Sequence, residues 1–76
     1  MVVAYVMVKA NTGNADQLRT EIDAIDGVEE THIVAGDVDL IAKLVVETTG
    51  EVKDISAGAV QEIAGVEDTR TYIAMD

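Results

Sequence analysis

Residues 25–32 read Ile25-Asp26-Gly27-Val28-Glu29-Glu30-Thr31-His32, and most of this pattern returns 38 positions later. Residues 63–70 read Ile63-Ala64-Gly65-Val66-Glu67-Asp68-Thr69-Arg70. In both copies an amphipathic stretch ends, a glycine follows and a β-branched run begins. Glycine after a last helical turn can adopt the left-handed conformation, and valine favours a strand. We therefore predict two β-α-β halves, each with a helix that ends just before the glycine of the repeat.

The hydrophobic pattern around the repeat predicts four strands. We expect these strands at positions 2–9, 28–35, 39–47 and 66–75, which are rich in apolar and β-branched residues. With a helix in each half, the order is β-α-β-β-α-β over residues 1–76. This order is typical of a single α+β domain of the ferredoxin-like type, in which two helices cover one face of a four-stranded antiparallel sheet.

Apolar residues at helical spacing mark the two helices. The first stripe contains Leu18, Ile22 and Ile25, and the second contains Val52, Ile55, Ala59 and Ile63. The stretch Asn11-Thr12-Gly13-Asn14 predicts a turn before the first helix. Asn14 with Gln17 and Thr48 with Glu51 have the spacing of a capping box, so we expect each helix to begin there.

Both faces of the predicted sheet are rich in apolar residues. In the third strand Leu40, Leu44 and Val46 alternate with Ile41, Lys43 and Val45. A sheet with one solvated face would alternate apolar with polar residues instead. We therefore expect the helix-free face to pack against a second copy of the chain, in a dimer with a two-fold axis.

The composition is strongly acidic. Fifteen acidic residues stand against five basic ones, which gives a net charge of −10, and cysteine is absent. At molar salt the Debye length is roughly 3 Å, which screens a crowded acidic surface, so we predict a halophilic, salt-adapted protein. Such a chain would repel a phosphate backbone, so we expect no direct DNA binding. We see no signal peptide or membrane span, and we expect a cytoplasmic location.

Three segments resemble a known family in their order and spacing. They are a Val-x-Val pattern at the start, Gly36-Asp37-Val38-Asp39-Leu40-Ile41 in a hairpin, and Gly65-Val66-x-x-Thr69-x-Thr71 near the end. Together they resemble the effector-binding domain of the Lrp/AsnC family, the leucine-responsive regulators of transcription. This module is often called RAM, and the resemblance covers essentially the whole chain.

The resemblance implies a ferredoxin-like fold whose sheets pack face to face in dimers, with dimers assembled into octameric or larger rings. It also implies a small effector, usually an amino acid, bound at contacts between dimers near the hairpin. Most members carry an N-terminal helix-turn-helix. This chain starts directly at the first strand, so we expect a stand-alone member that senses small molecules or co-assembles with a full-length regulator.

The resemblance also implies effector-binding residues. Gly36, Asp37, Val38 and Asp39 match the hairpin motif, and Thr69 and Thr71 match the last-strand motif. A zwitterionic amino acid needs acceptors for its ammonium and donors for its carboxylate, which aspartates, turn amides and threonine hydroxyls supply. Val38 stands where family members often have an aromatic residue, typically tyrosine, which removes a stacking wall and a hydroxyl.

Three alternatives stay open at this stage. An ACT-like amino-acid sensor has the same strand order and uses the turn after the first strand, where Gly13 lies. A pure oligomerisation or co-assembly module without a ligand is consistent with Val38. A small dimeric α+β-barrel enzyme would need a tuned acid-base pair, and we identify none. We therefore predict no enzyme activity, no catalytic residues, no metal site and no cofactor.

Overall fold

The computed structural model describes residues 1–11 and 13–76. Its elements follow the predicted order: β1 (Val2–Ala10), α1 (Ala15–Asp23), β2 (Val28–Ile33), β3 (Leu40–Val46), α2 (Thr49–Lys53), the π-helical segment η1 (Asp54–Val60) and β4 (Val66–Ile73). The strands predicted at 28–35 and 66–75 each end two residues earlier than expected. The turn predicted at 11–14 includes Thr12, which lies outside the described residues.

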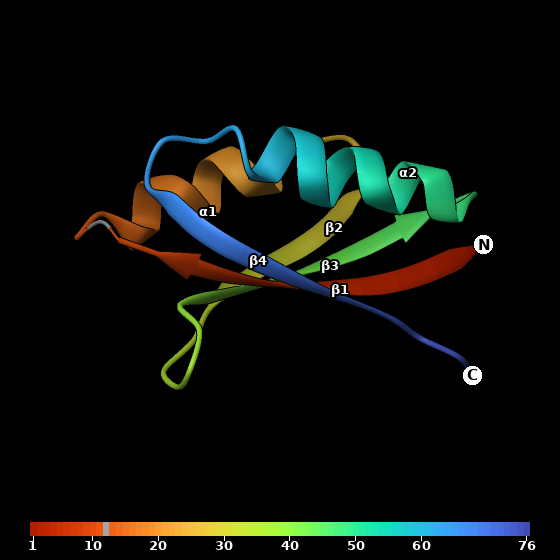
Figure 1. The fold of residues 1–76 in the computed structure, drawn as a ribbon, viewed down its shortest axis with the longest axis horizontal. Coiled ribbons are helices and arrows are strands. Elements are labelled where there is room, and N and C mark those ends of the chain that lie inside the picture. The colour runs from red at the N-terminus through yellow and green to blue at the C-terminus, as the bar shows by residue number, and fades with distance from the viewer. Residues whose placement is uncertain (12) are drawn as a thin grey trace.

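Within the described residues, four strands form one sheet in the order β2-β3-β1-β4, and every neighbouring pair is antiparallel. Helix α1 and the continuous α2–η1 helix lie on the same face of this sheet (Figure 1). The loop between β2 and β3 extends away from the helices. The ferredoxin-like α+β fold predicted from the sequence is therefore confirmed.

Alternate residues of the central strands form the core. Ala4, Val6 and Val8 of β1 are fully buried, and so are Leu40, Ala42 and Leu44 of β3. The two helices contribute Leu18, Ile22, Val52, Ile55 and Val60. Each buried aliphatic side chain of this size stabilises the fold by about 1.5–3 kcal/mol. The division predicted for the third strand, with Leu40, Leu44 and Val46 toward the helices, is confirmed.

Both helices begin at the predicted caps. The Asn14 side chain accepts a hydrogen bond from the Gln17 N–H at 3.3 Å. The Thr48 hydroxyl accepts one from the Glu51 N–H at 3.2 Å, and the Glu51 carboxylate accepts one from the Glu47 N–H at 2.9 Å. Because these side chains satisfy amides that have no partner within a helix, they fix where each helix starts.

The two glycines of the repeat have the left-handed backbone that the sequence predicted. Gly27 has φ of 97° and Gly65 has φ of 98°. At Gly27 there is also no room for a side chain. A Cβ atom there would lie 2.7 Å from Cδ1 of Ile55 and 2.9 Å from Cγ1 of Val46. The repeat therefore marks the two points where a helix returns the chain to the sheet.

The second helix departs from the predicted pattern. It is α-helical only over Thr49–Lys53 and π-helical over Asp54–Val60. Val52, Ile55 and Ile63 of the predicted stripe pack on the core. The prediction was wrong at Ala59, which is half-buried, because the fully buried Val60 takes its place. The cause is the π-helix, in which each amide bonds to a carbonyl five residues back, so that each turn contains more residues than an α-turn.

Candidate functional site

Asp39 fastens the β2–β3 loop to the central strand β1. Its N–H donates to the Val8 carbonyl at 2.9 Å, and its own carbonyl accepts from the Val34 N–H at 2.9 Å. Its carboxylate accepts a third hydrogen bond, from the Ala10 N–H at 2.8 Å. This side chain is half-buried, so its main role in the described structure is to position the loop.

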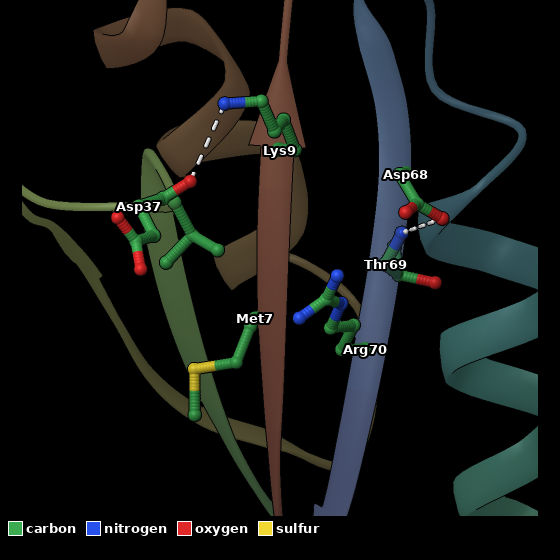
Figure 2. A pocket seen from close by; sticks show the side chains of 7 residues that line it. Met7, Lys9, Asp37, Asp68, Thr69 and Arg70 are labelled. Atoms are coloured by element: carbon green, nitrogen blue, oxygen red, sulfur yellow. Dashed lines mark hydrogen bonds between the residues drawn. The ribbon is translucent and has the colours of Figure 1, made fainter.

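A hollow of about 290 Å³ lies on the helix-free side of the sheet, between the β2–β3 loop and strands β1 and β4 (Figure 2). Its lining residues are Met7, Lys9, Asp37, Val38, Asp68, Thr69 and Arg70. The Lys9 ammonium donates to the Asp37 carbonyl at 3.3 Å and so closes one side. Pockets for small molecules range from about 300 to 1,000 Å³, so this hollow suits a small ligand.

The strand register brings the charged groups of this hollow together. Met7 is paired with Arg70, and Lys9 with Asp68, so all four side chains lie on the open face. In the part of the chain that is described, ion pairs join only His32 to Glu30 and Lys43 to Glu29. The Lys9 and Arg70 cations are therefore left without a carboxylate partner.

The two carboxylates of the hollow differ in their surroundings. Oδ1 of Asp68 accepts a hydrogen bond from the Thr69 N–H at 2.9 Å. The Asp37 side chain is exposed and accepts no hydrogen bond from the residues described, although its carbonyl accepts one from Lys9. Because one amide hydrogen bond leaves the Asp68 carboxylate its charge and further acceptor positions, both carboxylates add negative charge beside the cations of Lys9 and Arg70.

Thr69 and Thr71 occupy the opposite side of β4. They are paired with Val8 and Val6, whose side chains are buried beneath the helices. The Thr69 hydroxyl bonds the Gln61 amide at 2.6 Å and points away from the hollow in Figure 2. The structure therefore brings Asp37, Val38 and Thr69 to the hollow, although the Thr69 hydroxyl points to the helix side, and Thr71 is not among the lining residues.

Gly36 is exposed, and a Cβ atom there would contact nothing within 4 Å. Glycine at this position is therefore not required by the packing of the loop. Four further residues line the hollow that no sequence motif marked: Met7, Lys9, Asp68 and Arg70. The alternation of side chains along β1 and β4 indicates that these four residues lie on the helix-free face of the sheet. Only the register between the two strands shows that they surround one hollow.

A second group of charges lies on β2 and β3, away from the hollow. The His32 ring lies 2.6 Å from Oε2 of Glu30, and this hydrogen bond holds the pKa of Glu30 below its ordinary value. The Lys43 ammonium lies 3.2 Å from Oε2 of Glu29, and its hydrogen bond raises the pKa of Lys43. Both pairs lie at the surface, where water screens the charges, so each contributes little to stability.

Comparison with known proteins identifies the family. A model of the Lrp/AsnC ligand-binding domain matches residues 3–76, and the chain belongs to this family. The chain is 28% identical to the leucine-responsive regulatory protein of Haemophilus influenzae over 76 residues, all of this chain and 46% of that protein. It is 29% identical to that of Escherichia coli K12, over 97% of this chain and 47% of that protein. The chain thus spans about half the length of these relatives.

Solved structures agree with this assignment. TTHA0845 from Thermus thermophilus superimposes with a TM-score of 0.94 at 26% identity, over 100% of this chain and 95% of that one. A feast or famine regulatory protein from M. tuberculosis, solved with L-methionine, has a TM-score of 0.82 at 21% identity, over 100% of this chain and 51% of that one. This second likeness shows the fold alone.

The family match decides between two of the alternatives, because it favours the Lrp/AsnC domain over an ACT-like sensor. The matched relatives are named as regulatory proteins, which points away from an enzyme.

No three or more His, Cys, Asp or Glu side chains gather into a metal-binding group within residues 1–11 and 13–76. Over the same residues, no helix has the length and hydropathy to span a membrane.

Proposed function

We propose that this chain is an amino-acid-binding regulatory domain that acts in transcriptional regulation through its assembly with other subunits. The observation that carries the proposal is the hollow beside the β2–β3 loop, which is lined by two cationic residues, Lys9 and Arg70, and by two acidic ones, Asp37 and Asp68. An amino acid presents the complementary charges, a carboxylate and an ammonium. The L-methionine complex of the structural neighbour from M. tuberculosis supports this ligand class.

The predicted site residues have different parts in this proposal. Asp37 accepts from the ligand's ammonium, Val38 forms an apolar wall, and Asp39 holds the loop against β1. Gly36 belongs to the loop, and a Cβ atom there would contact nothing within 4 Å, so we assign it no contact with the ligand. Thr69 and Thr71 stay predictions, since their hydroxyls lie on the helix side and would have to meet a ligand held by another subunit.

A thermal-unfolding screen against each common amino acid tests the proposal. A ligand present at 100 times its dissociation constant stabilises a domain by about 2.7 kcal/mol. We expect one or a few amino acids to raise the unfolding temperature of the wild type and to have little effect on Asp37→Ala. Silence across the whole panel would contradict an amino-acid effector.

We also propose self-association through the helix-free face. Half-buried apolar side chains on this face outside the lining of the hollow include Val3, Ile41 and Val45, and Tyr5 is paired with the 56% exposed Tyr72. A dimer, and a ring of octameric type built from dimers, would cover this surface, and a full-length Lrp/AsnC regulator is a further partner. Sedimentation of the wild type and of Tyr72→Glu tests this, and a monomeric wild type would contradict it.

One observation favours a second function, assembly without a ligand. Val38 lines the hollow but offers no hydrogen bond and no ring for stacking. In that case amino acids would change neither the unfolding temperature of the domain nor the sedimenting mass of its assembly, whereas Tyr72→Glu would still reduce that mass.

Salt adaptation and a cytoplasmic location also stay predictions. The first is tested by the unfolding midpoint, which should rise steeply between low and molar KCl.

A further inference from the structure

We infer that self-association through the helix-free face is controlled by pH, and that protonation of His32 strengthens it. This inference rests on the self-association proposed above, to which it adds a regulatory group. It follows from the position of the chain's one histidine on that face and from the charges that surround it.

A bulge in the edge strand gathers the charges around His32. The register of β2 against β3 shifts between Val28 and Glu30, so that Glu29 and Glu30 both lie beside Lys43. The Lys43 ammonium lies 3.2 Å from Oε2 of Glu29, and the His32 ring lies 2.6 Å from Oε2 of Glu30. Two carboxylates, one ammonium and one imidazole therefore form what we call the charge cluster.

The charge cluster lies on the same face as the apolar side chains that a second copy would cover. His32 is paired with Ile41 of β3. Lys43 is paired with Tyr5, which is paired in turn with the exposed Tyr72. The His32 side chain is 63% exposed in the single chain. A second copy that covers Ile41 and Tyr5 therefore comes close to the charge cluster.

His32 lies on an edge strand, and both helices lie on the opposite face of the sheet (Figure 1). Along its row across the sheet, the next residues are Ile41 of β3 and Met7 of β1, which carry no charge, and then Arg70 at the far end, on β4. In the described part of the chain, the charged groups that face His32 are the other members of the cluster: Glu29, Glu30 and Lys43.

Protonation of His32 balances the charges of the cluster. While the imidazole is neutral, two carboxylates face one ammonium, so one negative charge has no counterpart. The imidazolium supplies that counterpart to Glu30, and moving a balanced pair out of water costs less than moving a single charge. The hydrogen bond from His32 holds the pKa of Glu30 below its ordinary value, so this carboxylate stays ionised while the histidine titrates.

The same change weakens the repulsion between two copies. The chain carries a net charge of −10, so a positive charge gained on the contact face reduces the repulsion that opposes association. Histidine ordinarily changes its charge between about pH 5 and 8. Because association and protonation are linked, a contact that favours the imidazolium becomes tighter as the pH falls through this range.

Sedimentation of the wild-type chain over a dilution series, at about pH 7.5 and about pH 5.5 and one low ionic strength, tests this inference. We expect the dissociation constant to be roughly two- to thirtyfold lower at the acidic pH, because each dimer gains two charge pairs of the strength of exposed pairs. If the wild type does not dissociate on dilution, the exchange of subunits between unlabelled and isotope-labelled chains, followed by mass spectrometry, should be slower at the acidic pH by the same factor.

Variants of the cluster separate the histidine from other causes. His32→Gln should remove the pH dependence, and His32→Lys, whose charge is permanent, should give the tighter association at both pH values. Glu30→Gln removes the unbalanced charge without a proton, so it should tighten association at about pH 7.5. Glu21→Gln, on the exposed side of α1 across the sheet, is the matched control and should leave the pH dependence as in the wild type.

The possible failures are distinguishable. A wild type that stays monomeric at both pH values would overturn this inference and the proposed self-association together. Assembly with the same dissociation constant and exchange rate at both pH values, or tighter assembly at the higher pH, would overturn this inference and leave self-association standing. A pH dependence that persists in His32→Gln would assign it to another group of the chain, and the inference would be wrong.

Discussion

Replacing Gly27 with alanine adds one methyl group at the most constrained point of the backbone. A residue other than glycine pays about 1–2 kcal/mol in the left-handed conformation, and Gly27 has φ of 97°. The new Cβ would also lie 2.7 Å from Ile55 and 2.9 Å from Val46, two core side chains that cannot move without disturbing the packing. Such overpacking typically costs about 1–3 kcal/mol.

Together these two effects predict that Gly27→Ala lowers the free energy of unfolding by about 2–5 kcal/mol. A domain of this size has a total stability of about 4–11 kcal/mol, so the loss is a large fraction of the whole. Urea denaturation followed by circular dichroism measures it, as a lower midpoint at an unchanged slope.

Two alanine variants serve as controls for Gly27. A Cβ at Gly36, in the exposed loop, contacts nothing within 4 Å, and the same is true at Gly58 in η1. Both have negative or extended backbone angles, so we expect Gly36→Ala to be neutral and Gly58→Ala to be neutral or stabilising. A loss below about 1 kcal/mol for Gly27→Ala, or an equal loss at Gly58, would refute the reasoning.

Three further predictions concern a cap, the loop and an exposed ion pair. Thr48→Ala should lower the free energy of unfolding by about 1 kcal/mol in urea denaturation, because the second helix loses its N-cap. Asp39→Ala should cost about 1–3 kcal/mol in the same assay, because it leaves the Ala10 amide without its partner. In an NMR titration, the pKa of Glu30 should lie below its ordinary value and rise in His32→Ala. Because this pKa is lowered in the folded state, the pair's small contribution is present above the ordinary pKa and is lost as the pH falls through the lowered one.

Matched variants give these predictions their controls. Thr49→Ala changes the residue after the cap and should be close to neutral, so an equal loss there would contradict the role of Thr48. Asp37→Ala removes a carboxylate that accepts no hydrogen bond in the residues described, so its stability should match the wild type. A pKa of Glu30 that is the same with and without His32 would show that the 2.6 Å contact does not persist in solution.

The sheet and its core could be predicted because strands follow a simple period. In β3, every second residue from Leu40 to Val46 is buried, which is the period of two that a strand imposes on its side chains. The repeated glycines were equally informative, since a helix that ends at a left-handed residue leaves a mark in the sequence. The π-helix left none, because the pattern of apolar residues was interpreted with the period of an α-helix, and Val60 took the place expected for Ala59.

The candidate site was predictable only in part. The motif indicated the loop at Asp37 and Val38, and both residues line the hollow. Lys9 and Arg70 lie far apart in the sequence, and they meet only because Met7 is paired with Arg70 across β1 and β4. No local pattern encodes that register. The motif also did not reveal that the Asp39 carboxylate is already bound to the main chain of β1.

The three hydrogen bonds of Asp39, with the contact from Lys9 to the Asp37 carbonyl, have a consequence for the entropy of binding. Ordering a mobile loop costs about 1–2 kcal/mol per residue, and a ligand that must order its own site binds more weakly by that amount. Here the loop next to the hollow is fastened to β1 before any ligand arrives. Its ordering is part of the free energy of folding, so even a ligand with few atoms can keep most of the affinity that its contacts provide.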